Sequence, residues 1–138
     1  MDATAVEVEA FFAAYKQAFA ACDTAGICSR FAYPAAIADG RTTTILPDYA
    51  AFCSDVEGFF KTYREMGMVD VALRSLQVTV KSPAYAIADV SWALLDAKGG
   101  DVLVFDASYI LGRHGGEELK IIAILSHNER ERAEGRLG

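Results

Sequence analysis

The fold of this chain is decided by its second half, where four long apolar stretches alternate with clusters of turn residues. The stretches are VDVALRSLQVTV (69–80), AYAIADVSWALL (84–95), VLVFDASYIL (102–111) and LKIIAILS (119–126). They are separated by Ser82-Pro83, Lys98-Gly99-Gly100 and His114-Gly115-Gly116, which are residue types that favour turns. Strands joined by short turns pair as antiparallel neighbours, so we expect a four-stranded meander.

Ahead of these strands, large apolar side chains recur every three or four residues, a pattern typical of amphipathic helices. A first helix carries this pattern from Val8 to Cys22. Asp23 can cap a short second helix, which we expect to include Phe31. That helix should stop near Pro34, because the residue before a proline avoids helical geometry.

A hairpin and a third helix complete the first half. Residues 35–38 and 42–46 are expected strands on either side of Asp39-Gly40, a dipeptide suited to the positive φ angles of a tight hairpin. The third helix begins near Tyr49, and Gly67 is its terminator. The sequence therefore predicts an α+β fold, with three N-terminal helices packed on a curved, mostly antiparallel sheet of about six strands.

Length and charge bound the class of protein. A chain of 138 residues is of ordinary single-domain size, and we expect one domain over residues 1–138, with an ordered core at 6–128 and a charged tail at 129–138. A net charge of −6, without any basic run interleaved with aromatics, argues against nucleic acid and anionic membranes as partners. No apolar stretch is long enough for a membrane span, and the acidic N-terminus is unlike a signal peptide. We expect a cytoplasmic protein.

The cysteines and histidines do not form a metal-binding pattern. Cys22, Cys28 and Cys53 are an odd set without a Cys-x-x-Cys motif, which favours buried thiols in a reducing compartment. The two histidines, His114 and His127, have no cluster of ligands at a recognised spacing, so neither a metal nor another cofactor is predicted. His127, at the end of the last strand, is either an acid or base at a pocket mouth or a hydrogen-bonded structural histidine.

Several local features accompany the order helix, helix, hairpin, helix and four strands. They are FAYP (31–34) before the first strand, Trp92 in mid-strand and the closing IAILSHNE (122–129). In these features residues 6–128 resemble the nuclear-transport-factor-two-like superfamily, which includes SnoaL-like cyclases and ketosteroid isomerases. The resemblance implies a conical domain with an apolar pocket between helices and sheet. It does not choose between an enzyme and a non-catalytic dimerisation or transport module.

The resemblance also implies two catalytic residues. Tyr15 lies eight residues before Asp23, as the isomerases' hydrogen-bonding tyrosine lies before its own aspartate, and Asp39 matches their proton-shuttling aspartate. The isomerases' proton-donating acid is not matched, because Ala107 stands at its position and the neighbouring Asp106 must face the other side of the strand. This departure argues against steroid isomerisation itself.

Each of these residues also has a structural interpretation. Tyr15 fits an ordinary core aromatic on the first helix, and Asp39 before Gly40 fits a turn residue. Two functions stay open: a cofactor-free isomerase or cyclase that moves protons on an apolar carbonyl compound, and a non-catalytic ligand-binding or dimerisation module. In either case we expect a small apolar ligand in a pocket lined by Phe12, Tyr15, Phe19, Phe59, Trp92 and Tyr109.

The last two strands predict a partner as well. Alternation leaves Val104, Ile110, Ile122 and Ile124 on the side away from the expected pocket. Such a patch is larger than monomers usually expose, and the helices are needed on the pocket side. We therefore expect a homodimer formed through one face of the sheet.

Overall fold

A computed structural model describes residues 3–114 and 116–128, and its elements follow the predicted order. The helices are α1 (Ala3–Ala20), α2 (Thr24–Cys28) and α3 (Tyr49–Glu65). The strands are β1 (Phe31–Ala38), β2 (Thr43–Leu46), β3 (Asp70–Val80), β4 (Tyr85–Leu95), β5 (Asp101–Gly112) and β6 (Lys120–Ser126). The predicted charged tail, residues 129–138, lies outside the described residues.

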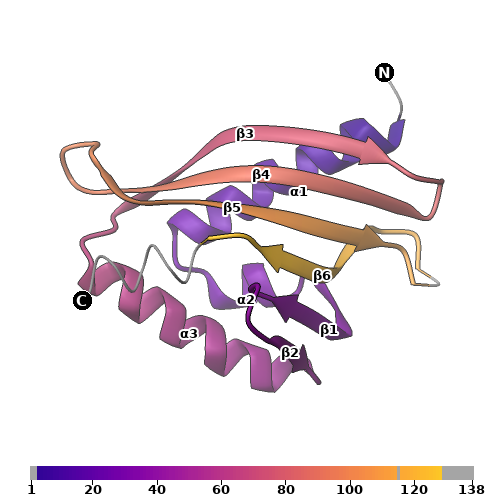
Figure 1. Ribbon diagram of the computed structural model, residues 1–138, viewed down its shortest axis with the longest axis horizontal. Coiled ribbons are helices and arrows are strands. Elements are labelled where there is room, and N and C mark those ends of the chain that lie inside the picture. The colour runs from indigo at the N-terminus through magenta and orange to yellow at the C-terminus, as the bar shows by residue number, and fades with distance from the viewer. Residues whose placement is uncertain (1–2, 115, 129–138) are drawn as a thin grey trace.

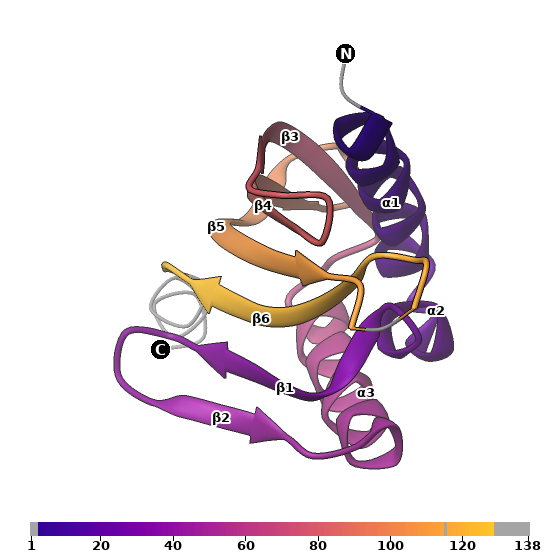
Figure 2. The same ribbon diagram turned by 90° about the vertical axis from the view of Figure 1, so that its right-hand side faces the viewer.

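All six strands form one sheet in the order β2-β1-β6-β5-β4-β3. The meander of β3, β4, β5 and β6 is confirmed, with every neighbouring pair antiparallel. The strand β1 joins the meander parallel to β6, so the sheet is mixed (Figure 1). The sheet is curved, and all three helices lie on one side of it (Figure 2). The predicted α+β fold of three helices on a six-stranded sheet is confirmed.

No helix in the described residues is long and apolar enough to cross a membrane.

The helices begin and end where local chemistry favours it. The Asp23 carboxylate accepts a hydrogen bond from the Gly26 amide at the start of α2, and the Asp48 carboxylate does the same for Ala51 at the start of α3. Gly67 follows α3 with a φ of +104°, a conformation that costs glycine least. These contacts mark where α2 and α3 begin and where α3 ends.

The prediction that the second helix includes Phe31 is wrong. Helix α2 ends at Cys28, and Phe31 is already the first residue of β1, where it pairs with Ile121 of β6. The helical spacing of Phe31 is overridden because pairing with β6 buries its side chain in the core. Pro34 lies inside β1, after a cis peptide bond from Tyr33.

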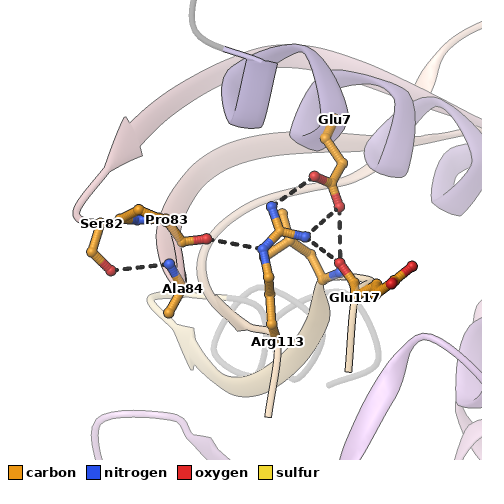
Figure 3. A network of polar contacts seen from close by, with 7 residues as sticks. Glu7, Ser82, Pro83, Ala84, Arg113 and Glu117 are labelled. Atoms are coloured by element: carbon orange, nitrogen blue, oxygen red, sulfur yellow. Dashed lines mark hydrogen bonds and ion pairs between the residues drawn. The ribbon is translucent and has the colours of Figure 1, made fainter. Parts of the chain in front are cut away.

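A polar network ties α1 to the ends of the long strands (Figure 3). The Arg113 guanidinium donates to both carboxylate oxygens of Glu7, at 2.8 and 3.0 Å. It also donates to the carbonyl oxygens of Pro83, in the β3–β4 turn, and Glu117, in the β5–β6 connection. One side chain thus holds together three segments that are far apart in the sequence.

Candidate functional site

An aromatic cavity of about 90 Å³, here called the inner cavity, lies between the helices and the sheet. Its walls come from α1, α2, α3 and from strands β1, β5 and β6. The lining residues share an apolar or aromatic character and are Tyr15, Phe19, Ile27, Phe31, Ile37, Phe52, Val56, Phe59, Phe60, Tyr63, Phe105, Ala107, Tyr109, Ile124 and Ser126. The only polar groups of these side chains are hydroxyls, so the inner cavity suits an uncharged apolar group.

A second space of about 300 Å³, here called the outer hollow, adjoins the inner cavity. The two share the lining residues Ile37, Phe52, Phe59, Tyr63 and Ser126. The outer hollow adds Leu46 and a more polar set of side chains, namely Asp39, Thr44, Asp55 and Thr62. Polarity therefore rises from the inner cavity to the outer hollow, which is the arrangement that an amphipathic ligand requires.

Tyr15 lines the inner cavity and is also part of the aromatic core. Its side chain is 5% exposed. The ring lies 5.8 Å from those of Phe12, Trp92 and Tyr109, measured between centroids. The two interpretations of Tyr15 are thus compatible, because the same ring packs in the core and borders the cavity. A catalytic role for its hydroxyl stays a prediction.

Asp39 combines a turn role with a place at the outer hollow. Its Oδ1 accepts hydrogen bonds from the amides of Arg41 at 2.9 Å and Thr42 at 3.0 Å, and Gly40 in the same turn has a φ of +88°. The residue nevertheless lines the outer hollow. Tyr15 therefore borders the inner cavity and Asp39 borders the outer hollow. A ligand that contacts both residues would have to extend through the two spaces. The proposed base role of Asp39 also stays a prediction.

The other predicted lining residues divide into two sets. Phe19, Phe59 and Tyr109 line the inner cavity. Phe12 and Trp92 are fully buried and are not among its lining residues. They lie behind the lining: the Phe12 ring contacts Tyr109 at 5.0 Å, and the Trp92 indole N–H donates to the Tyr109 hydroxyl at 2.8 Å. Helical and strand periodicity placed both on the correct face, but periodicity does not tell a cavity wall from the layer beneath it.

The side chains of Asp106 and Ala107 on β5 lie on opposite faces of the sheet, as predicted. Ala107, which the resemblance aligns with the acid of the isomerases, borders the inner cavity. Asp106 faces away and accepts a hydrogen bond from the Ser91 hydroxyl at 2.7 Å. His127 also lies on that other side: its Nε2 is 2.9 Å from the Ser108 hydroxyl oxygen, and Ser108 donates to Asp89 at 2.6 Å. His127 is therefore hydrogen-bonded away from the mouth of the outer hollow, which fits its structural interpretation.

The prediction that Ile124 of β6 lies on the side of the sheet away from the pocket is wrong. The pairing of β5 with β6 shifts register between Ile110 and Leu111, so that Ile110 pairs with Ala123 and Leu111 with Ile121. This bulge inserts one residue and reverses the alternation after it. Ile124 consequently lines the inner cavity, as does Ser126, which the sequence analysis missed. The residue types around the bulge are ordinary strand residues, so the sequence does not reveal the bulge.

No group of three or more His, Cys, Asp or Glu side chains that could hold a metal ion occurs among residues 3–114 and 116–128. The two spaces are lined by aromatic and aliphatic side chains, hydroxyls and the carboxylates of Asp39 and Asp55.

Comparison with known proteins shows which family and which solved structures this chain resembles. The model of a family described as NTF2-like protein (DUF6841) matches residues 6–129. No curated protein matches the chain. Among solved structures, an NTF-2 like protein of unknown function from Shewanella oneidensis MR-1 is similar with a TM-score of 0.71 and 8% identity, over 90% of this chain and 98% of that one.

Two further solved structures are similar over nearly their whole length. A ketosteroid isomerase-like protein from Erwinia carotovora atroseptica SCRI1043 has a TM-score of 0.67 and 14% identity, over 92% of this chain and 97% of that one. Aln2 from a Streptomyces species has a TM-score of 0.70 and 16% identity, over 91% of both chains. At these identities the similarity shows the fold alone.

Proposed function

The chain belongs to the NTF2-like family DUF6841, and we propose that it binds a small, largely apolar molecule in the inner cavity and outer hollow. The observation that carries this proposal is the position of Phe59, whose side chain is 48% exposed and lines both spaces. A half-exposed ring at the junction of an aromatic cavity and a polar hollow gains burial when an apolar ligand covers it.

The lining favours a neutral or cationic ligand over an anionic one. No Lys, Arg or His is among the described residues that line either space, whereas Asp39 and Asp55 both line the outer hollow. An anionic group placed in the inner cavity would lose its hydration without meeting a cationic side chain.

The two volumes bound the size of the ligand. Ligand sites commonly span about 300–1,000 Å³. The inner cavity, at about 90 Å³, is well below that range, and the outer hollow, at about 300 Å³, is at its lower end. We therefore infer a molecule that inserts a small apolar group into the inner cavity and keeps its larger or more polar part in the outer hollow.

A matched pair of fluorescent probes tests this proposal. N-phenyl-1-naphthylamine is neutral and brightens in apolar surroundings, and 1-anilinonaphthalene-8-sulfonate is the same molecule with an added sulfonate. We expect the neutral probe to bind more tightly, and Phe59→Ala to weaken it by about tenfold, the effect of a lost aromatic contact. Tyr49→Ala is the matched control, since Tyr49 is an aromatic residue of the same helix, is 43% exposed and lines neither space.

Tight binding of the sulfonate, or equal losses in the Phe59→Ala and Tyr49→Ala variants, would contradict a neutral-ligand site at this place.

A second candidate function is proton transfer on a carbonyl ligand, with Asp39 as base and Tyr15 as hydrogen-bond donor to the developing oxyanion. What favours it is that the two residues border adjoining spaces that one ligand could span. Because Ala107 replaces the second donor of the isomerases, we expect a weaker oxyanion site than theirs. The alternative is a non-catalytic ligand-binding or dimerisation module.

A small β,γ-unsaturated ketone such as 3-cyclohexenone distinguishes these candidates. If Asp39 is the base, Asp39→Asn should lower the rate of conversion to the conjugated ketone by about 10²–10⁴-fold. The melting temperature should hardly change, because an asparagine Oδ1 can still accept the amide hydrogens of Arg41 and Thr42. Equal rates in the two proteins, or no conversion by either, would remove proton transfer on such ketones and leave ligand binding.

We propose in addition that a second copy of the chain covers the sheet face opposite the helices. The residues on that face alternate with the cavity lining and include Val104, Ile110, Ala123 and Leu125, of which Leu125 is 42% exposed. A symmetric contact between two such faces would bury these side chains in both copies.

A further inference from the structure

An arginine whose Nε has no hydrogen-bond acceptor lies between α2 and β1. Arg30 follows α2 and precedes β1, and its Nε is buried without a hydrogen-bond partner among residues 3–114 and 116–128. The ion pairs of this described part of the chain do not include Arg30 either. Buried polar groups in proteins nearly always have a partner, and a cationic group costs most without one. The side chain therefore carries a charge that no described carboxylate pairs with.

The position of Arg30 is fixed by its backbone and by an aromatic ring. Its amide donates to the carbonyl oxygen of Ile27 at 3.1 Å, and its carbonyl oxygen accepts the amide hydrogen of Ile121, in β6, at 2.8 Å. The guanidinium carbon lies 5.5 Å from the centroid of the Phe11 ring of α1, within the range of a cation–π contact. The guanidinium is therefore held in place before a ligand arrives, which lowers the entropy cost of binding.

A hollow of about 390 Å³, here called the arginine hollow, lies beside this side chain. Its lining includes Arg30, Phe11 and a second cationic residue, Lys120. The Lys120 ammonium donates to the carbonyl oxygen of Ser29 at 2.7 Å, which holds it at the residue before Arg30. None of the described residues that line the arginine hollow lines the inner cavity or the outer hollow. The arginine hollow is therefore a separate space with two cationic groups.

Two glutamates also line the arginine hollow, and they limit the charge of a ligand. Glu7 is already engaged, because both of its carboxylate oxygens accept hydrogen bonds from Arg113 (Figure 3). Glu118 lies 4.0 Å from the Lys120 ammonium, but its side chain is 85% exposed, so solvent screens this ion pair. Arg30, Lys120 and Arg113 thus exceed the two carboxylates by one charge. A doubly charged group such as a phosphate would meet more repulsion from the carboxylates than a singly charged one.

We propose that the arginine hollow binds a small organic monocarboxylate. Because the Nε is shielded, the two terminal nitrogens of Arg30 are the groups that reach a ligand, and their fork matches the two oxygens of a carboxylate. Lys120 supplies a second positive charge, and Ala10 and Leu119 supply apolar lining for the carbon skeleton of the ligand. This site does not depend on the ligand proposed for the inner cavity, so either proposal can fail without the other.

Three ligands with the same aromatic ring test this chemistry. Benzoate carries one negative charge, benzamide is its neutral counterpart, and phenyl phosphate is mostly doubly charged at neutral pH. Titration followed by NMR measures each affinity, and the Arg30 Nε–Hε signal reports on the site itself. We expect benzoate to bind about tenfold more tightly than either of the others, because only benzoate combines the charge-assisted hydrogen bonds with a single charge. Equal binding of benzamide, tighter binding of phenyl phosphate, or binding of none of the three would overturn the proposal.

Two variants test whether benzoate binds at Arg30. Arg30→Met removes the charge and keeps an unbranched side chain beside the Phe11 ring, and should weaken benzoate binding by about tenfold. Its melting temperature should hardly fall, because the Nε has no partner to lose. Arg64→Met is the matched control, since Arg64 is exposed in the last turn of α3 and lines none of the three spaces. Equal benzoate affinities in the two variants, or a loss of stability in Arg30→Met with its affinity unchanged, would show a structural arginine and overturn the proposal.

The wild-type complex decides the matter if Arg30→Met does not fold. Nuclear Overhauser contacts from the benzoate ring to the methyl group of Ala10, which lines the arginine hollow, would support the site. Contacts to Ile124 without any to Ala10 would place benzoate in the inner cavity and overturn the proposal.

Discussion

The indole N–H of Trp92 donates a hydrogen bond of 2.8 Å to the hydroxyl of Tyr109, and both side chains are buried. Trp92 is on β4 and Tyr109 on the neighbouring strand β5, where it lines the inner cavity. The bond satisfies the only polar atom of the Trp92 side chain and fixes the direction of the Tyr109 ring. The back wall of the cavity is therefore held by a residue that does not itself line it.

Removal of the Tyr109 hydroxyl should show how much the hydrogen bond from Trp92 contributes to stability. In Tyr109→Phe the buried Trp92 N–H loses its acceptor, which we expect to lower the free energy of unfolding by about 1–3 kcal/mol. Urea unfolding measures the change, and Tyr85→Phe, at a tyrosine that is 47% exposed, is the control. A Tyr109→Phe variant as stable as the control would show that the bond contributes nothing to the fold.

Acid should weaken the network that joins α1 to the long strands. The hydrogen bonds from Arg113 hold the pKa of Glu7 below its ordinary value of 4.5. The stabilisation is therefore complete above about pH 4.5 and is lost as the pH falls through the lowered pKa. Since both side chains are partly exposed, at 39% for Glu7 and 24% for Arg113, solvent screening keeps the effect modest.

The measurement is urea unfolding at neutral and acid pH. Glu7→Gln should be less stable than the wild type at pH 7 and should lose less stability on acidification, because it has no carboxylate to protonate. Glu9→Gln changes an exposed residue of the same helix and should keep the wild-type pH dependence. If Glu7→Gln also keeps the full wild-type dependence, Glu7 is not the group responsible.

Light scattering at micromolar concentration tests the dimer. We expect a mass twice the 14.9 kDa of one chain, because the outer sheet face carries Val104, Ile110 and Leu125. Leu125→Glu places a charge on that face and should shift the protein to monomer. Val6→Glu, at an exposed position of α1, should leave the mass unchanged. A wild-type mass of one chain would refute the dimer.

Much of this fold could be predicted because its signals are local. The four long strands are bounded by turn residues, and Asp39-Gly40 marks its hairpin. The end of α2 at Cys28 and the parallel pairing of β1 with β6 could not be predicted in the same way. Both depend on pairing with β6, which lies about ninety residues further along the chain, so no local pattern around Phe31 records them.

The candidate site could be predicted only in part. Aromatic periodicity selected Phe19, Phe59 and Tyr109 as lining residues, since each lies on the apolar face of its element. It could not tell that Trp92 lies one layer deeper, because depth depends on the size of the residues in front of it. It also could not place Ile124, because the bulge in β6 is set by pairing with β5.

The claim that the cavity binds a ligand is tested most directly by locating a bound ligand. Two neighbouring residues of β6 lie on opposite faces of the sheet and so distinguish the two possible locations. Ile124 faces the inner cavity, whereas Ala123 pairs with Ile110 on the opposite face of the sheet. In the complex with N-phenyl-1-naphthylamine, we predict nuclear Overhauser contacts from the probe to the methyl groups of Ile124 and Ala107, and none to Ala123. Contacts to Ala123 or Leu125 alone would place the probe on the outer face and contradict a ligand site in the cavity.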